Sequence, residues 1–402
     1  MPIAQNQFMG RGEFIALMAM MFATIAFSID AMLPAIPQIA SEITGGDRAK
    51  AAWVLTSFVA GMGLGTFFAG PLSDAFGRKV IVYVGAVIYI LSAVAAWATS
   101  SLEWMLVARF IQGIGASGPR VVSLAIIRDL FVGREMARIL SIAMTIFILV
   151  PAIAPAMGAL IINFFGWRSI FPAFVVFSLI SVIWVGTRLN EPLPPENRRP
   201  MRIGLMIDAV KQIVSNRTVR LSIAMQTLML SMLFSTLTMI QPIYDDIYNR
   251  PDTFPIWFGA IALLSGGSSL LNAFIVTRFG MHKVITWSIA LQVLIGAIVL
   301  VTMSSISTDG FFVFIFWQFC LFAQAGLTVG NLNAIAMGPM GHVAGMAASI
   351  IGGISTVAAA LIASPVSLLL GETPLPLIII VLILGVLAII LMRRINQIEN
   401  AA

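Results

Sequence analysis

The sequence predicts an all-α integral membrane protein in which twelve membrane-spanning helices form two bundles of six. Three observations predict this fold class. Hydrophobic residues make up 59% of the 402-residue chain and charged residues only 10%, about half the charged fraction of a soluble domain. Apolar runs long enough to cross about 30 Å of hydrocarbon recur along the chain. One long polar interruption, at 188–220, leaves six such runs on each side.

The twelve expected spans follow one another with mostly short polar connections. The first is too long for a signal-peptide core and precedes no small-residue cleavage site, so we interpret it as a membrane helix. The division between the last two rests on the short interruption at 371–373. By residue number, the expected spans are 12–37, 50–73, 79–99, 102–128, 136–163, 168–189, 216–245, 254–278, 283–304, 309–338, 341–370 and 373–393.

The polar interruption predicts two domains, 1–189 and 216–402, joined by a cytoplasmic linker at 190–215. The first part of the linker is rich in proline and charge, which is typical of extended chain. Its second part predicts an amphipathic helix on the inner membrane surface, and an early start of the seventh span is the alternative. The apolar face of that helix would carry Ile203, Met206, Ile207, Val210, Ile213 and Val214.

The distribution of Lys and Arg predicts the orientation in the membrane, because basic loops stay on the cytoplasmic side. With the N-terminus inside, the inner segments hold seventeen basic residues. The outer loops hold only Arg48, Lys50, Arg168 and Arg250. We therefore expect both termini to face the cytoplasm. The net charge of +6 reflects this topology and gives no indication of a nucleic-acid partner.

Short repeats relate the two halves. "FGRK" at 76–79 follows the second span, and "FGMHK" at 279–283 follows the eighth. "FSIDAMLPAIP" at 27–37 has a counterpart in "FSTLTMIQPIY" at 234–244. Pseudo-repeated halves are typical of secondary transporters that rock about a central site.

The turn "GPLSDAFGRK", 70–79, is the strongest local motif. Gly70 permits close helix approach, Gly77 permits a positive φ, and Asp74 can accept hydrogen bonds from backbone or Arg donors. The stretch resembles the loop signature of the major facilitator superfamily, G-x-L-x-D-x-x-G-R-K, and departs from it only at Ala75, where a basic residue is common. The resemblance implies the major facilitator fold and conformational control by Gly70, Asp74, Gly77, Arg78 and Lys79. The alternative to conformational control is a turn whose basic residues only set the orientation of the protein in the membrane.

The fourth span carries Arg109 and Arg120, which lie eleven residues apart and hence on almost one helical face, about 16 Å apart along the axis. Both are expected to point into a water-filled cavity or at a carboxylate. For Arg120, snorkelling toward the inner surface is the alternative. "R-x-x-Q-G", 109–113, resembles the fourth-helix motif of drug:proton antiporters in this superfamily, which implies that Arg109 takes part in proton coupling.

Asp30 is a carboxylate inside the first span, where a buried charge costs at least a few kcal/mol. Counted along the helices, Asp30 is about 24 Å from the inner surface and Arg109 about 12 Å from the outer one, so the two lie at similar depth. Attraction to Arg109 and the cost of burial oppose each other, so such a carboxylate can exchange a proton. "DAMLPAIP", 30–37, resembles the first-helix motif D-x-Y-L-P-A-x-P of Bcr/CflA (bicyclomycin-resistance-type) drug:proton antiporters, with Met32 in place of Tyr.

Other features bear on the cavity and on the direction of transport. Candidate cavity residues are Met32, Gln112, Arg120, Gln241 and Asn333, although hydrogen bonding between helices is an alternative for the amides. "VPAIAPAMGA", 150–159, matches the antiporter signature of the fifth span at Pro155 and Gly158 but not at Ala154. The alternative to a functional role for the two prolines, given equal weight, is that they only kink the helix.

The sequence lacks the residues that other classes of membrane protein would require. "GASG", 115–118, reads like a rhomboid-protease motif, but His282 and His342 fall at predicted cytoplasmic loops, so close helix packing explains it better. Two His and one Cys predict no metal site. The sequence contains no nucleotide-binding P-loop and no repeated pore loops of a channel.

We therefore expect a monomeric, cofactor-free carrier, not an enzyme, that exports small amphiphilic compounds in exchange for protons, with lipid as its surroundings and the proton gradient as its energy source. The alternative is a carrier of the same fold for a metabolite, sugar or siderophore, including a proton symporter.

Overall fold

The computed structural model describes residues 9–198, 203–305, 310–369 and 373–401. These described residues are almost entirely helical and contain no β-strand. Eleven helical segments are long and apolar enough to cross a membrane, and a shorter apolar stretch, Leu149–Phe165, lies within a further long helix. The predicted fold class, a bundle of twelve membrane-crossing helices, is confirmed.

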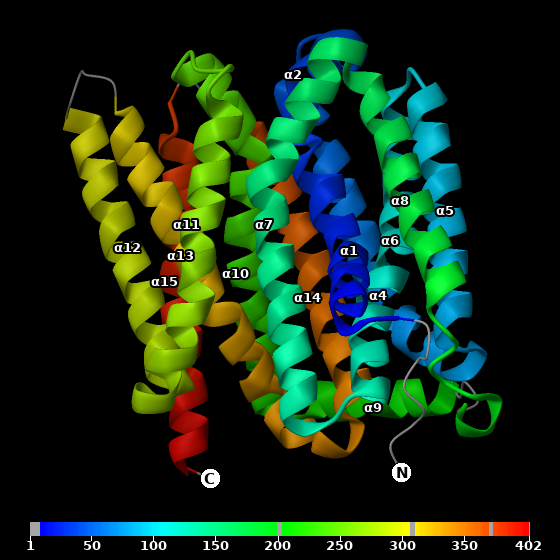
Figure 1. The fold of residues 1–402 in the computed structure, drawn as a ribbon. Coiled ribbons are helices and arrows are strands. Elements are labelled where there is room, and N and C mark those ends of the chain that lie inside the picture. The colour runs from blue at the N-terminus through cyan, green and yellow to red at the C-terminus, as the bar shows by residue number, and fades with distance from the viewer. Residues whose placement is uncertain (1–8, 199–202, 306–309, 370–372, 402) are drawn as a thin grey trace. The chain divides into compact units, whose positions relative to one another are not determined.

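The first six crossings are built from eight α-helices and two 3-10 turns (Figure 1). In order they are α1 Arg11–Asp30, η1 Leu33–Ala35, α2 Ile36–Ile43, α3 Arg48–Ala51, α4 Trp53–Phe76, α5 Arg78–Ala98, α6 Leu102–Leu130, α7 Gly133–Phe165, η2 Trp167–Ser169 and α8 Ile170–Arg188.

The remaining segments follow a short 3-10 turn, η3 Pro195–Asn197. In order they are α9 Ile203–Ser215, α10 Arg217–Pro242, η4 Ile243–Ile247 (a π-helical turn), α11 Phe254–Phe279, α12 Met281–Ser305, α13 Phe311–Met337, η5 Gly338–Val343, α14 Ala344–Val366, η6 Ser367–Leu369 and α15 Leu375–Ala401.

The first span is not one continuous helix. We expected a single helix over 12–37, but α1 ends at Asp30, and the chain continues through η1 into α2. Pro34 and Pro37 explain the break, because proline lacks the N–H that would bond to the preceding turn and its ring clashes with that turn. Asp30 therefore occupies the C-terminal end of a helix inside the span, the kind of position at which carriers build binding sites.

The chain forms two compact units. Unit 1 comprises 1–35 and 57–206, and unit 2 comprises 36–56 and 207–402. Residues 36–56, which the sequence assigns to the first half, pack within unit 2 through Arg48, which pairs with Asp245 at 3.1 Å, and Trp53, whose Nε1 donates to the Ser364 carbonyl at 3.0 Å. The sequence-based division at 190–215 stays a prediction.

Glycine allows the helices of unit 1 to approach one another closely. A Cβ at Gly113 on α6 would collide with the Phe58 carbonyl of α4, and one at Gly115 would lie 2.6 Å from the Gly85 carbonyl of α5. Ser117, two residues after Gly115, donates to the Ile114 carbonyl at 2.7 Å, and a Cβ at Gly65 of α4 would collide with its hydroxyl oxygen. Close packing therefore accounts for the "GASG" stretch.

In unit 2, α10 packs against α13, α14 and α15. Its start is well defined, because the Asn216 side chain accepts from the Val219 N–H at 3.1 Å and caps the helix. This cap marks the boundary between α9, which ends at Ser215, and α10, which begins at Arg217. Ile207, Val210 and Val214 of α9 are exposed, and Ile213 is buried.

Candidate functional site

Arg109 of α6 is the centre of a buried polar network in unit 1. Its side chain is 0% exposed. Nη1 donates to Gln112 Oε1 at 2.8 Å, and Nη2 donates to the Ser28 carbonyl at 3.0 Å. The guanidinium carbon lies 4.4 Å from the centroid of the Phe58 ring, within the range of a cation–π contact. Arg109 thus joins α6 to the last turn of α1.

The end of α1 supplies the acceptor for Arg109. In an unbroken helix the Ser28 carbonyl would bond to the N–H of Met32, but that N–H bonds to Ile29 instead, at 3.3 Å. Carbonyls in the last turn of a helix need partners from elsewhere. The guanidinium provides one, so the break in the first span creates the position that Arg109 occupies.

Tyr89 of α5 extends the network. The Ser28 hydroxyl donates to the Thr24 carbonyl at 2.5 Å, and its oxygen lies 2.6 Å from the Tyr89 hydroxyl. With the Ser28 proton engaged, the Tyr89 hydroxyl is the donor in their shared bond. Sequence reasoning missed both residues. The sequence did contain a signal for Tyr89, which lies in the middle of an apolar span. A buried tyrosine hydroxyl requires a hydrogen-bond partner, so a polar group was to be expected beside it.

Asp30 lies beside this network but is not bonded to it. Its side chain is buried, at 5% exposed. Among the described residues, no hydrogen bond or ion pair joins its carboxyl group to Arg109, so the facing pair expected from depth is not formed in this conformation. Met32, two residues on, is fully buried, and Gly158 of α7 packs so closely that a Cβ would collide with the Ala31 carbonyl.

The other predicted cavity residues lie apart from this network. Arg120 is exposed, and its Nη1 lies 3.9 Å from the sulfur of Met62. In unit 2, Asn333 accepts from Gln226 Nε2 at 2.8 Å, and Gln241 Nε2 donates to Asp245 at 2.8 Å. The Asn333 bond joins α13 to α10, which is the hydrogen bonding between helices that was the alternative for this amide. The Gln241 bond is local, to a residue four positions further along the chain. Within the described part of the chain, no three His, Cys, Asp or Glu side chains gather as a metal site would require.

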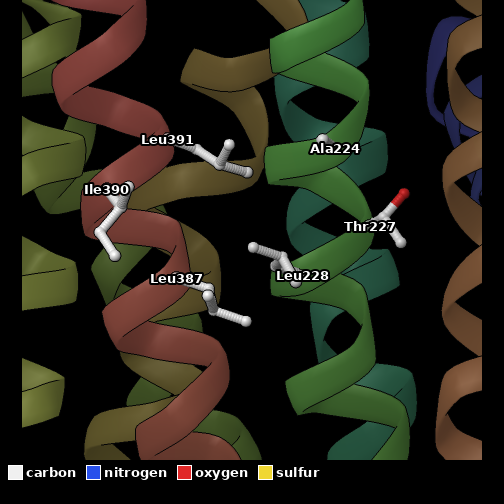
Figure 2. Close-up of a pocket in the computed structure, with 6 residues that line it drawn as sticks. All are labelled: Ala224, Thr227, Leu228, Leu387, Ile390 and Leu391. Atoms are coloured by element: carbon white, nitrogen blue, oxygen red, sulfur yellow. The ribbon is translucent and has the colours of Figure 1, made fainter.

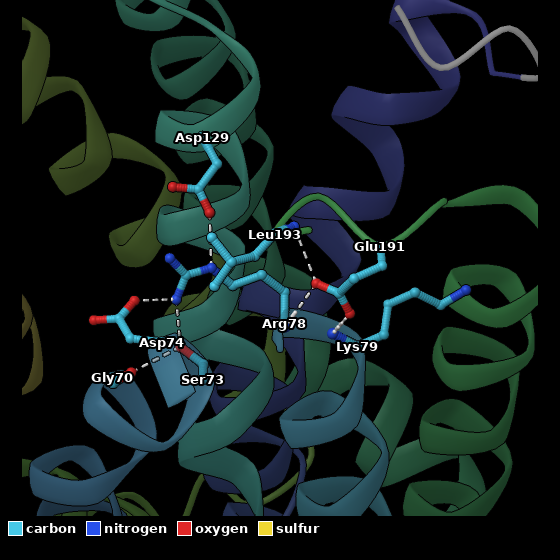
Figure 3. A network of polar contacts seen from close by, with 8 residues as sticks. All are labelled: Gly70, Ser73, Asp74, Arg78, Lys79, Asp129, Glu191 and Leu193. Carbon is cyan, nitrogen blue, oxygen red and sulfur yellow. Dashed lines mark hydrogen bonds and ion pairs between the residues drawn. The ribbon is translucent and has the colours of Figure 1, made fainter. Parts of the chain in front are cut away.

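The turn between α4 and α5 holds a second network (Figure 3). The Arg78 side chain is 4% exposed, and its Nη1 donates to Asp74 and to Ser73 at 2.6 Å each. Its Nε donates to Asp129, at the end of α6, at 2.7 Å. Ser73 in turn donates to the Gly70 carbonyl at 2.8 Å. Gly77 has a φ of +105°, a conformation that side chains disfavour.

Glu191, just after α8, binds the start of α5 (Figure 3). Its carboxylate accepts from the N–H groups of Arg78 at 2.8 Å and Lys79 at 2.9 Å. A helix N-terminus has unpaired N–H groups and a partial positive charge, which favour a carboxylate there. Lys79 Nζ donates to the carbonyls of Gly186 and Leu189, at 3.1 and 2.7 Å.

The sequence predicted Gly70, Asp74, Gly77, Arg78 and Lys79 as one turn, and the structure brings all five together. Sequence reasoning missed Asp129 and Glu191. The available signals were positional, because Asp129 directly follows the fourth predicted span and Glu191 is the first acid after the sixth. Arg78 thus connects α4, α5 and α6, while Glu191 and Lys79 fasten the end of α8 to the same turn.

Comparison with known proteins places this geometry in context. The family model described as Major Facilitator Superfamily matches residues 16–364. The chain is 30% identical over 347 residues to the uncharacterized MFS-type transporter YdgK of Bacillus subtilis, covering 84% of each chain. It is 27% identical to the bicyclomycin resistance protein homolog of Haemophilus influenzae, covering 90% of this chain and 91% of that one. It is 28% identical to the multidrug resistance protein MdtL of Shewanella oneidensis, covering 81% of each.

Solved structures support the fold. The crystal structure of a D-xylose-proton symporter superposes with a TM-score of 0.72 at 14% identity, covering 94% of this chain and 97% of that one. A partially occluded, inward-open conformation of the xylose transporter XylE from E. coli superposes with a TM-score of 0.69 at 13% identity, covering 95% and 98%.

Proposed function

Because the chain belongs to the Major Facilitator Superfamily, and is therefore a multi-pass membrane transporter and not an enzyme, we propose that it exports small amphiphilic compounds in exchange for protons. The names of two relatives, a bicyclomycin resistance protein homolog and the multidrug resistance protein MdtL, support drug efflux. We place it in the bacterial inner membrane as a monomer with both termini in the cytoplasm. The observation that carries the proposal is the contact of Arg109 with the helix end that bears Asp30.

Asp30 is the proposed proton-binding group and Arg109 the group that responds to it. In the observed conformation Arg109 bonds to Gln112 and the Ser28 carbonyl, an arrangement that suits a protonated, neutral Asp30. Loss of the proton would leave a buried anion two residues from that carbonyl. Its attraction for the guanidinium favours a rearrangement at the break in the first span. Substrate and proton compete for this switch, so that one leaves as the other binds.

The proton gradient is sufficient for such export. One proton moving inward across 100 mV releases about 2.3 kcal/mol, and one pH unit adds about 1.4 kcal/mol. Together these support a roughly 500-fold gradient of a neutral substrate, since each tenfold step requires about 1.36 kcal/mol.

The experiment is transport by Asp30→Asn in proteoliposomes with an imposed pH gradient. We expect substrate still to bind, but gradient-driven accumulation to fall to the level of passive leak, because the amide cannot carry the proton. Asp252→Asn is the matched control, since Asp252 is an exposed carboxylate outside the predicted spans. Unchanged, pH-dependent accumulation by Asp30→Asn would disprove the role of Asp30.

The alternative, import of a metabolite, sugar or siderophore with protons, differs in the direction of proton movement. A pH-sensitive dye inside the vesicles separates the two. Antiport predicts that a substrate gradient drives protons in the opposite direction to the substrate, and symport predicts movement in the same direction. An efflux and susceptibility panel in a strain without its own exporters would then identify the compounds carried.

A further inference from the structure

An apolar crevice lies between α10 and α15 of unit 2 (Figure 2). Its volume is about 320 Å³, at the lower end of the range of small-molecule sites. Its lining is apolar except for the Thr227 hydroxyl. Leu387 and Ile390 on its α15 side are 45% and 50% exposed, so the crevice opens outward from the bundle. The other lining residues are Ala224, Leu228 and Leu391.

On each of the two helices that form the crevice, the lining residues are followed by an arginine toward the same end of the helix pair. On α10, Arg220, Ala224 and Leu228 are spaced four residues apart and form one stripe. On α15, Leu387, Leu391 and Arg394 are spaced four and three residues apart and form another. Figure 2 shows Ala224 opposite Leu391 and Leu228 opposite Leu387, so the antiparallel helices are in register. One further turn brings Arg220 and Arg394 to about the same depth.

The positive charges of these two arginines can bind an anionic ligand. Arg220 and Arg394 are both exposed, and among the described side chains no carboxylate forms an ion pair with either. Arg220 Nη1 donates only to the Val214 carbonyl, at 3.0 Å, which leaves its other N–H groups for a ligand. The basic end of both helices is the one that the distribution of charge assigns to the cytoplasm.

We propose that this crevice binds one anionic phospholipid of the inner leaflet, with an acyl chain along Ala224, Leu228, Leu387 and Leu391 and the headgroup phosphate between Arg220 and Arg394. An apolar crevice below two arginines matches the two parts of such a molecule, because a basic pocket between helices recognises the headgroup and the hydrocarbon fills the gap. The crevice is formed within unit 2 alone and includes no residue of the Arg109 network, so the proposal does not depend on the proposed transport activity.

The test measures the thermal midpoint of the purified full-length protein in detergent during titration with phosphatidylglycerol. Phosphatidylcholine with the same acyl chains and inorganic phosphate are the comparison ligands. We expect saturable stabilisation by phosphatidylglycerol and none by phosphate alone. Each arginine near an anionic lipid contributes roughly a fivefold factor. The double variant Arg220→Gln/Arg394→Gln should therefore bind phosphatidylglycerol about 25-fold more weakly.

Two further variants test whether phosphatidylglycerol binds at this crevice. Ala224→Phe fills the crevice and keeps both arginines, and it should also weaken phosphatidylglycerol binding. Arg278→Gln removes one positive charge from the end of α11 and is the matched control, with binding expected to be unchanged. Equal stabilisation by phosphate alone, equal weakening by Arg278→Gln, or full binding by either crevice variant would overturn the proposal.

Discussion

Arg109 shows why an arginine, and not simply a positive charge, occupies its position. It contacts two acceptors on different elements, the Gln112 amide and the Ser28 carbonyl, and it lies over the Phe58 ring. A guanidinium presents several donors in a fixed plane, whereas an ammonium is a compact, strongly hydrated point charge. The identity of the residue therefore follows from the geometry of the contacts at the end of α1.

We predict that Arg109→Lys abolishes coupled transport although it keeps the charge. The lysine cannot hold both acceptors in one plane, so the end of α1 loses its partner. Substrate-driven proton movement in proteoliposomes measures the effect, and expression and thermal midpoint monitor folding. Arg168→Lys, within the η2 turn, is the matched control. Normal coupling in Arg109→Lys would mean that charge alone suffices.

Tyr89 provides a milder test of the same network. Tyr89→Phe removes one buried hydrogen bond to Ser28, which should cost about 1 kcal/mol of stability. Tyr83→Phe on the same helix is the control, since within the described residues the Tyr83 hydroxyl forms no hydrogen bond. We expect a lower thermal midpoint for Tyr89→Phe only. A similar midpoint for both variants would show that the Ser28 contact contributes nothing to stability.

At the scale of elements, α7 packs closely against the break in the first span. The Ala31 carbonyl lies where a Cβ of Gly158 would be, so α7 supports the non-helical stretch that follows Asp30. The prolines of α7, Pro151 and Pro155, lie within one continuous helix, Gly133–Phe165.

Gly158→Ala is therefore expected to destabilise the protein by about 1–3 kcal/mol, since a methyl group against backbone cannot be accommodated without a shift. Gly267→Ala is the matched control, because nothing lies within 4 Å of its new Cβ and alanine favours the helix. Thermal unfolding in detergent should show a lower midpoint for the first and an equal or higher midpoint for the second. The reverse order would contradict the packing described for α7.

The α4–α5 turn connects elements far apart in the sequence. Glu191 binds N–H groups 113 and 112 residues away, and Arg78 bonds to Asp129 across 51 residues. A carboxylate at a helix N-terminus contributes roughly 0.3–1 kcal/mol when exposed and more when partly buried. The turn can thus bias one conformation of the carrier without contacting its substrate.

We predict that Glu191→Gln lowers the thermal midpoint and alters conformational exchange, while the pattern of transported compounds stays the same. Glu196→Gln, an exposed acid in η3, should be neutral. Asp74→Asn should slow exchange with unchanged substrate choice, and Asp129→Asn should have the larger effect on stability, because its side chain is 19% exposed and that of Asp74 is 43%. A changed substrate profile in any of these variants would contradict a purely conformational role.

At the scale of the whole molecule, the orientation rests on the basic residues of alternate loops. We predict that a membrane-impermeant thiol reagent applied to intact cells labels Asp252→Cys but not Glu196→Cys, in a Cys320→Ser background. Opening the cells should make both positions reactive. Both residues are exposed in the structure, so a difference in labelling reports the side of the membrane. Labelling of Glu196→Cys in intact cells would reverse the orientation.

The sequence predicted the spans because crossing a membrane requires long apolar runs, and it predicted the α4–α5 turn because its glycines and charges lie within ten residues. It did not predict that the first span breaks after Asp30, although Pro34 and Pro37 were the local cause. It also did not predict that residues 36–56 pack within unit 2. Their partners lie far away in the sequence, and no pattern within 36–56 indicates which distant residues they contact.

The sequence by itself determined the number of membrane crossings and the residue types at the site, since hydrocarbon thickness and the chemistry of side chains act locally. Only the tertiary structure decided the partners. Arg109 bonds to a backbone carbonyl 81 residues away, and Asp30, at matching depth, is left without an ionic partner among the described residues. The physical reason is that helix ends expose backbone acceptors, and their positions depend on how the helices pack, which no local pattern records.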